Sequence, residues 1–183
     1  MNPTGDQELL ARAQTGADGF GELFDKYYDK IYAYAYRRVG ARAPAEDIAA
    51  CTFEDALRGI QRLHWDGKPI AAWLYRIASR RVADHYRRAK ATPTADIENV
   101  NLEAATSPAD NAEQSETQSE VRVALARLEP RDREIIQFVY FDELQTVEIA
   151  AMFNCTTNSI YVRLHRALKR LRTLLEEDRH GME

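Results

Sequence analysis

One segment in the middle of the chain, residues 92–120, constrains the fold more than any other feature. It carries seven acidic residues, two prolines and few large apolar side chains, and it has neither lysine nor arginine. Such a segment cannot bury enough apolar surface to fold alone, so it is typical of a solvated linker. The 183-residue chain is therefore expected to form two small domains, residues 1–91 and 121–183, on either side of a flexible acidic linker.

Both flanking blocks show the apolar periodicity of helices. In the first block, apolar residues recur every three or four positions from Phe20 to Ala35 and again from Ala49 to Ile60, where Leu57 is counted with the buried face. No segment alternates apolar and polar residues as a half-buried strand does. The predicted fold class is all-α, with one helical bundle in each domain.

Several function classes are not expected from this composition. The two cysteines, Cys51 and Cys155, lie far apart without ligand-spaced partners, so we expect no disulfide framework, no metal site and a location in the reducing cytoplasm. There is no glycine-rich phosphate loop and no Gly-x-Ser-x-Gly elbow, so neither an enzyme nor a cofactor is expected. No run approaches the roughly 18 apolar residues of a membrane span, and the first ten residues do not resemble a signal peptide.

The net charge of −4 is unevenly distributed along the chain. Residues 1–91 sum to +3, residues 92–120 to −7 and residues 121–183 to zero. The acidic balance therefore belongs to the linker alone, and it does not argue against nucleic acid as a partner of the flanking blocks.

The last block contains a candidate helix-turn-helix. A short apolar helix is expected over residues 146–153, followed by a turn at Asn154 and a longer helix over residues 159–175. Asn154 tolerates the left-handed conformation that such a turn often needs, and Thr156 and Thr157 are cap candidates. Five basic residues and no acid lie between residues 161 and 172, which suits a helix that enters the major groove. The alternative is an ordinary helical hairpin with a solvated basic face.

A second basic helix is expected at residues 70–88. From residue 76 to residue 90, six basic residues accompany a single acid, and aromatic side chains are interleaved with them. Binding of single-stranded nucleic acid requires ring faces for unstacked bases and cations for the backbone. The alternative is that Trp73 and Tyr75 are ordinary core aromatics and that the arginines are only solvated.

Taken together, several short runs resemble the extracytoplasmic-function (ECF) group of sigma-70 family RNA polymerase sigma factors. The runs are AEDIAACTF at 45–53, AWLYRIA at 72–78, LEPRDRE at 128–134, EIA at 148–150 and SI at 159–160. The resemblance covers nearly the whole chain. It implies that residues 1–91 form a sigma-2 domain that docks on core polymerase and melts the −10 promoter element. Residues 121–183 would form a sigma-4 domain that recognises the −35 element.

The resemblance also implies site residues for each task. Within residues 1–91, the loop from Arg62 to Ile70 would hold a base flipped from the non-template strand. The residues that would contact the −10 element are Arg62, Trp65, Lys68, Trp73, Arg76, Arg80, Arg81 and Arg88. Those that would face the −35 major groove are Ser159, Tyr161, Val162, Arg163, His165, Arg166 and Lys169. Those that would dock on the coiled coil of the polymerase beta-prime subunit are Glu46, Asp47, Ala50, Cys51 and Glu54.

The implied partners are core RNA polymerase, through this coiled coil and the beta flap, promoter DNA, and an anti-sigma factor. Some positions depart from the family pattern. Members often have Gln-Glu where this chain has Ala50-Cys51, and Lys or Arg followed by Ser where it has Tyr161-Val162. Two alternatives therefore stay open at this point. One is a dimeric helix-turn-helix regulator that does not recruit polymerase, and the other is an adaptor that mimics a sigma factor in protein–protein interactions.

Overall fold

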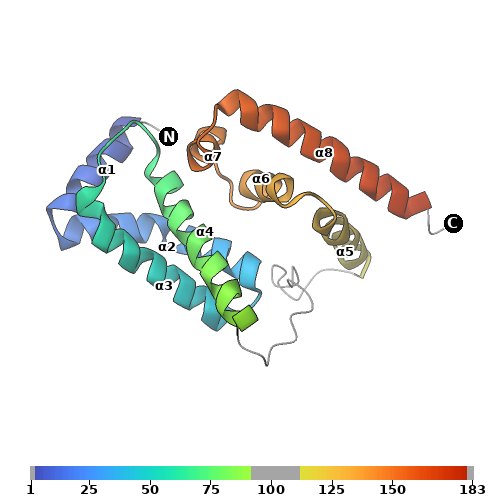
Figure 1. Cartoon of the computed structure of the whole chain (residues 1–183), viewed down its shortest axis with the longest axis horizontal. Coiled ribbons are helices and arrows are strands. Elements are labelled where there is room, and N and C mark those ends of the chain that lie inside the picture. The colour runs from blue at the N-terminus through green and yellow to red at the C-terminus, as the bar shows by residue number, and fades with distance from the viewer. Residues whose placement is uncertain (1–2, 92–111, 181–183) are drawn as a thin grey trace. The chain divides into compact units, whose positions relative to one another are not determined.

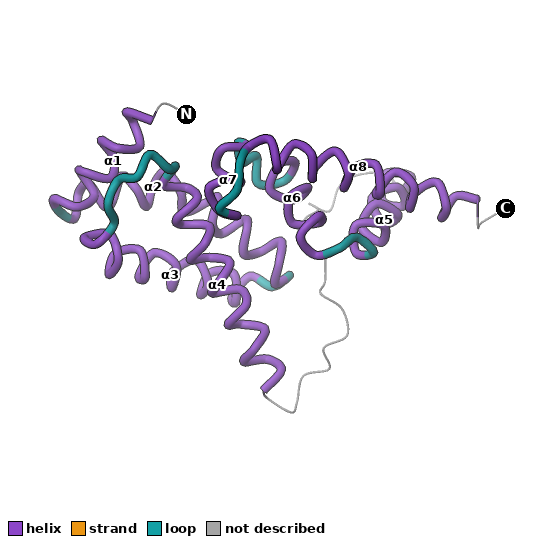
Figure 2. Tube along the Cα trace, turned by 45° about the horizontal axis from the view of Figure 1, so that its top comes forward, coloured by secondary structure: helices purple, strands orange, loops and turns teal. Residues whose placement is uncertain are grey.

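The computed structural model describes residues 3–91 and 112–180, which are helical apart from turns and short loops (Figure 1). The chain divides into two compact units, Met1–Ala105 and Thr106–Glu183, called unit 1 and unit 2 below. No strand occurs among the described residues (Figure 2), so the predicted all-α fold with two helical domains is confirmed. No helix in these ranges is long and apolar enough to cross a membrane.

The described part of unit 1 consists of long helices and one short 3-10 helix, joined by two tight turns and a longer loop before α4. They are α1 (Pro3–Thr15), α2 (Ala17–Val39), α3 (Arg42–Gly59), the short 3-10 helix η1 (Ile60–Arg62) and α4 (Ile70–Ala91). Helix α2 ends at Gly40, which adopts a left-handed conformation with φ of 69° and donates its N–H to the carbonyl of Tyr36. Pro44 lies in the first turn of α3, where its missing N–H costs no hydrogen bond.

The core of unit 1 lies between α2, α3 and α4. Tyr34 of α2 and Tyr75 of α4 are both fully buried, and their rings meet edge to face with centroids 5.2 Å apart, a favourable geometry for aromatic pairs. Tyr75 is therefore a core aromatic, as the alternative interpretation of the basic helix allowed. Leu57 was expected in this core, but its side chain is 55% exposed. Because α3 buries Ala56, its neighbour Leu57 points about 100° away around the helix.

Helix α1 packs on α2, and its apolar periodicity is too short to predict it. Its buried face consists of Leu9, Leu10 and Ala13. The two helices approach very closely at Gly19 of α2, where a Cβ atom would lie 2.0 Å from the carbonyl oxygen of Arg12. Glycine is therefore required at this crossing.

Unit 2 contains α5 (Ala112–Ala126), α6 (Pro130–Tyr140), α7 (Thr146–Phe153) and α8 (Thr157–His180) within its described residues. Helix α5 begins inside the segment that the sequence analysis assigned to the linker. Five of the nine residues 112–120 are glutamate or glutamine, which are good helix formers, although the stretch has little apolar character. Residues 92–111 lie outside the described ranges, so the rest of the linker prediction is not addressed by the structure.

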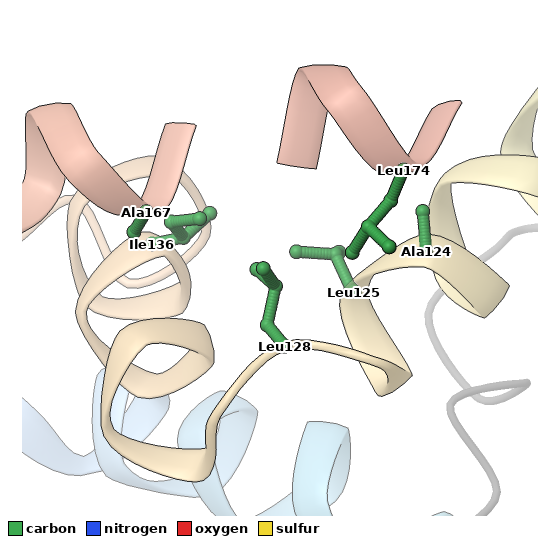
Figure 3. Packing of buried hydrophobic residues seen from close by; sticks show 6 residues of the cluster. All are labelled: Ala124, Leu125, Leu128, Ile136, Ala167 and Leu174. Atoms are coloured by element: carbon green, nitrogen blue, oxygen red, sulfur yellow. The ribbon is translucent and has the colours of Figure 1, made fainter. Parts of the chain in front are cut away.

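The core of unit 2 joins α5 and α6 to the long helix α8. Figure 3 shows Ala167 of α8 beside Ile136 of α6, and Leu174 of α8 beside Ala124 and Leu125 of α5. Arg133 fastens the turn between α5 and α6, since its Nε donates to the carbonyl of Leu125 at 2.8 Å. These contacts leave the opposite face of α8 uncovered within unit 2.

Candidate nucleic-acid interfaces

The helix-turn-helix in unit 2 is built by the local chemistry of its turn. Asn154 is left-handed, with φ of 51° and ψ of 49°, as its side-chain type predicted. Its N–H and that of Cys155 both donate to the carbonyl of Ala150, which closes α7. Helix α8 then starts on Thr156, whose Oγ1 accepts the N–H of Ser159 at 3.2 Å, as the cap prediction required.

The beginning of α8 presents its side chains to solvent. Tyr161 is 59% exposed and Val162 is 43% exposed, and His165, Arg166 and Lys169 are exposed as well. No ion pair joins Arg166 or Lys169 to another residue in the part of unit 2 that the structure describes. Arg166 and Lys169 can therefore approach a partner without first breaking an ion pair of their own.

Two of the residues predicted for the −35 contact also hold the motif together. The Oγ of Ser159 lies 2.8 Å from that of Thr156, and the half-buried Arg163 pairs with Asp132 of α6 at 3.5 Å. A shallow hollow at this end of α8 is lined by Asp132, Ser159, Val162 and Arg166 among others. Acidic Asp132 of α6 therefore lies beside the basic start of α8.

Helix α4 in unit 1 carries its basic residues on two different faces. Arg76 and Arg80 are exposed, and Trp73 beside them is half-buried. Arg81 instead faces α3, where its Nε donates to Asp55 at 2.7 Å. This bond is the main reason that the pKa of Arg81 is raised, which keeps its guanidinium protonated.

The structure thus brings some predicted −10 residues next to predicted docking residues. Arg81 and Arg88 line one hollow with Asp47 and Cys51 of α3. The sequence analysis had placed these pairs in different sites. Of the predicted −10 residues on α4, Arg76 and Arg80 are exposed and make no ion pair with another helix in the described part of unit 1.

Loop 62–69, which begins at the last residue of η1 and ends before α4, carries the other predicted −10 residues. Arg62 and Lys68 are exposed, and Trp65 is half-buried. The loop turns at Gly67, which has a φ of 80°, and Asp66 accepts the N–H of Lys68 at 3.1 Å and pairs with its ammonium group at 2.9 Å. The hydrogen bond from the Lys68 side chain is the main cause that lowers the pKa of Asp66.

The predicted docking residues lie on one side of α3. Asp47, Ala50 and Glu54 are exposed, whereas Cys51 is half-buried. Glu46 is half-buried too and pairs with Arg42 at 2.8 Å, so it also stabilises the first turn of its own helix. The exposed Leu57 continues this side one turn after Glu54, and the sequence analysis missed it because an apolar residue in a helical stripe is usually core.

No group of three or more histidine, cysteine or acidic side chains that could hold a metal ion occurs within residues 3–91 and 112–180. The candidate sites in these ranges are the basic start of α8, the basic and aromatic surface of α4 with its loop, and the acidic and apolar side of α3. Their chemistry suits binding to nucleic acid and to protein partners.

Comparison with known proteins identifies the family. The family model for sigma-70 region 2 matches residues 23–92, and that for sigma-70 region 4 matches residues 118–171. The chain is 35% identical over 175 residues to the ECF RNA polymerase sigma factor BldN of Streptomyces coelicolor, covering 93% of this chain and 66% of that protein. It is 31% identical over 170 residues to the ECF RNA polymerase sigma factor SigW of Bacillus subtilis, covering 87% of this chain and 90% of that protein.

A solved structure shares the fold. The sigma factor RpoE from Bartonella quintana, in complex with the anti-sigma factor NepR, superposes with a TM-score of 0.62 at 22% identity, covering 87% of this chain and 98% of that chain. The matches to regions 2 and 4 favour a sigma factor over a helix-turn-helix regulator that does not recruit polymerase and over an adaptor that mimics a sigma factor. The chain belongs to the ECF group of the sigma-70 family, the RNA polymerase subunits that bind core polymerase and direct it to promoter DNA.

Proposed function

We propose that the two units divide promoter recognition between them. Unit 2 reads the −35 element as duplex through the start of α8, and unit 1 melts the −10 element and holds its non-template strand through α4 and loop 62–69. One observation carries this proposal. Both units expose basic side chains, but only unit 1 combines them with tryptophans on and beside a loop.

The geometry of α8 supports duplex readout. A helix that follows a left-handed turn can place its first turns in the major groove. Arg166 can make a bidentate contact with guanine there, while Val162 and Tyr161 offer apolar contact to thymine methyl groups. Lys169, one turn after His165, is placed to neutralise a phosphate.

The geometry of unit 1 supports capture of a single strand. Trp65 and Trp73 are half-buried, so each ring keeps part of its surface available for a base. Arg76 and Arg80, one helical turn apart on the exposed face, are placed to neutralise successive phosphates. Bases that leave the duplex would gain stacking here that paired bases cannot make.

The exposed side of α3 is proposed to bind the beta-prime coiled coil of polymerase. Leu57 supplies an apolar contact, and Asp47 and Glu54 supply charge around it. Leu57→Asp should weaken binding to core polymerase strongly, while Leu57→Met should bind nearly as tightly as wild type. Similar affinities for the two variants would exclude this side of α3.

Three further roles complete the proposal. Unit 2 also contacts the beta flap of core polymerase, which keeps its recognition helix at the −35 element. An anti-sigma factor holds the free protein, as one does in the Bartonella quintana structure. The chain acts in the cytoplasm and supplies recognition rather than catalysis.

A reconstituted transcription assay tests the proposed function. Purified protein is added to sigma-free core polymerase, and run-off transcripts are measured on the DNA fragments that the holoenzyme selects from a genomic pool. We expect specific transcripts that neither component makes alone. Fragments that are bound by the protein without transcripts would support a regulator, and binding to polymerase without selection of DNA would support an adaptor.

A further inference from the structure

Helix α1 contacts the start of the loop that we propose holds the flipped base. The side-chain amide of Gln14 donates to two backbone carbonyls, those of Ile60 and Leu63, each at 2.8 Å. In the other direction, the side-chain amide of Gln61 donates to the backbone carbonyl of Gln14 at 2.8 Å. Three hydrogen bonds therefore join the end of α1 to η1 and to the first residues of the loop.

The same helix contacts the end of the loop. Asp6 is only 2% exposed, and its Oδ2 accepts the N–H of Ile70, the first residue of α4, at 3.1 Å. The preceding residue is Pro69, which has no N–H, and a carboxylate at a helix N-terminus is favoured by the helix dipole. Asp6 thus caps α4 from another helix, while Lys26 approaches its second oxygen at 3.4 Å.

Between these two anchors, the hydrogen bonds of the loop are local. Lys68 bonds to Asp66 two residues before it, and the exposed Arg62 and Lys68 point to solvent. In Figures 1 and 2 the loop runs alongside α1 between the ends of α3 and α4. The hydrogen bonds from α1 to the two ends of the loop therefore fix the position of the loop in unit 1.

We propose that α1 is a positioning element for base recognition, with Gln14 and Asp6 as its positioning residues. This inference rests on the proposed role of the loop in holding a −10 base. A pocket for one base discriminates only if its walls stay within about 0.5 Å of the productive geometry. Release of either anchor lets the loop shift, so the base preference decreases even while the protein stays folded.

Base selection measures this effect directly. Holoenzyme is assembled from sigma-free core polymerase and full-length protein, and it selects from single-stranded DNA with a randomised −10 segment. The measured quantity is the ratio of the preferred base to the other bases at the most selective position. Gln14→Leu should lower this ratio by roughly tenfold. Thr15→Val is the matched control, because the Thr15 hydroxyl donates to the carbonyl of Arg12 within α1 and makes no hydrogen bond to either end of the loop in the described part of unit 1.

The Asp6 variants separate positioning from the mere presence of a stable helix. Asp6→Asn keeps an acceptor for the Ile70 N–H and should retain most of the base preference, whereas Asp6→Ala should lose it. Binding of all variants to duplex DNA carrying the −35 element should be unchanged, since α8 belongs to the other unit.

The outcomes are distinct. If α1 served stability alone, its variants would lower the bound fraction of every sequence equally and leave the ratio at the wild-type value, which would overturn the inference. A ratio that falls in Trp65→Ala but not in Gln14→Leu or Asp6→Ala would overturn the role of α1 and keep the role of the loop. A wild-type holoenzyme without any base preference would overturn both.

Discussion

The two proposed DNA-binding surfaces differ in how much of the fold each one needs. The start of α8 is a surface of one helix, fixed by a turn at Asn154 and a cap at Thr156. The surface of unit 1 is assembled from three elements, since loop 62–69 connects η1 to α4 and its ends are bonded to α1. Reading a duplex requires an exposed, rigid helix, because the groove itself is regular. Holding an unstacked strand requires a shaped site, which only tertiary contacts can provide.

The basic side chains follow the same division. On α8, Arg166 and Lys169 are exposed and make no ion pair with the described residues. On α4, Arg81 forms a salt bridge with Asp55 of α3, whereas the adjacent Arg80 is exposed. Charge counting along a sequence treats these arginines alike, although only the exposed ones are available to phosphate.

The largest expected effect tests whether the two units fold independently. Gly19→Ala would place a methyl group against the carbonyl of Arg12, and the neighbouring atoms are backbone of α1, which leaves it no room. We expect unit 1 to lose about 3 kcal/mol of stability. Both tryptophans of the chain, Trp65 and Trp73, belong to unit 1, so urea unfolding followed by their fluorescence reports this unit alone.

Circular dichroism in the same titration reports both units. The helices of unit 2 should unfold at the wild-type urea concentration in Gly19→Ala, while the fluorescence transition moves to lower urea. A common shift of both transitions would show that the two units stabilise each other and do not fold independently.

The second prediction concerns the surface of α8. Arg166→Ala should weaken binding to −35 duplex by about 1–3 kcal/mol, the range for one bidentate base contact. Arg172→Ala on the same helix is the control, because Arg172 lies further along α8 and pairs with Glu176. Fluorescence anisotropy with labelled duplex measures both. Equal losses would mean that α8 contributes charge without direct readout.

Much of this fold follows from the sequence, and the exceptions have physical causes. The helices of both cores, the left-handed Asn154 and the Thr156 cap were predicted because periodicity and turn chemistry are local properties. Helix α1 was missed because its apolar face is short, and its contacts through Gln14 join residues more than forty positions apart. The salt bridge of Arg81 was missed for a similar reason, since its partner Asp55 belongs to another helix.

A smaller effect is expected at the cap of α8. Thr156→Ala removes the acceptor for the N–H of Ser159 and should cost about 1 kcal/mol, whereas Thr156→Ser keeps the hydroxyl and should cost little. The change should appear in the circular dichroism transition of unit 2 and not in tryptophan fluorescence. If the alanine variant were as stable as the serine variant, the cap would be dispensable and α8 would be held by its core alone.

The smallest effects separate two neighbouring arginines of α4. Arg81→Ala should lower the stability of unit 1 by about 0.5 kcal/mol, because it breaks a partly exposed bridge, and Arg80→Ala should leave it unchanged. Arg80→Ala should instead slow promoter opening by roughly threefold, as expected for one lost phosphate contact. Permanganate reactivity of promoter thymines measures opening. Reversed behaviour of the two variants would assign the wrong face of α4 to DNA.

The division between duplex reading and strand capture is tested most directly by transcription from a template that is already open. The double variant Arg76→Ala, Arg80→Ala and the single variant Arg166→Ala are each assayed with core polymerase on an ordinary promoter and on the same promoter with a mismatched −10 bubble. We predict that the bubble restores transcription by the double variant to near the wild-type level and leaves Arg166→Ala impaired. Equal rescue of both, or rescue of Arg166→Ala alone, would contradict the assignment of the two tasks to the two units.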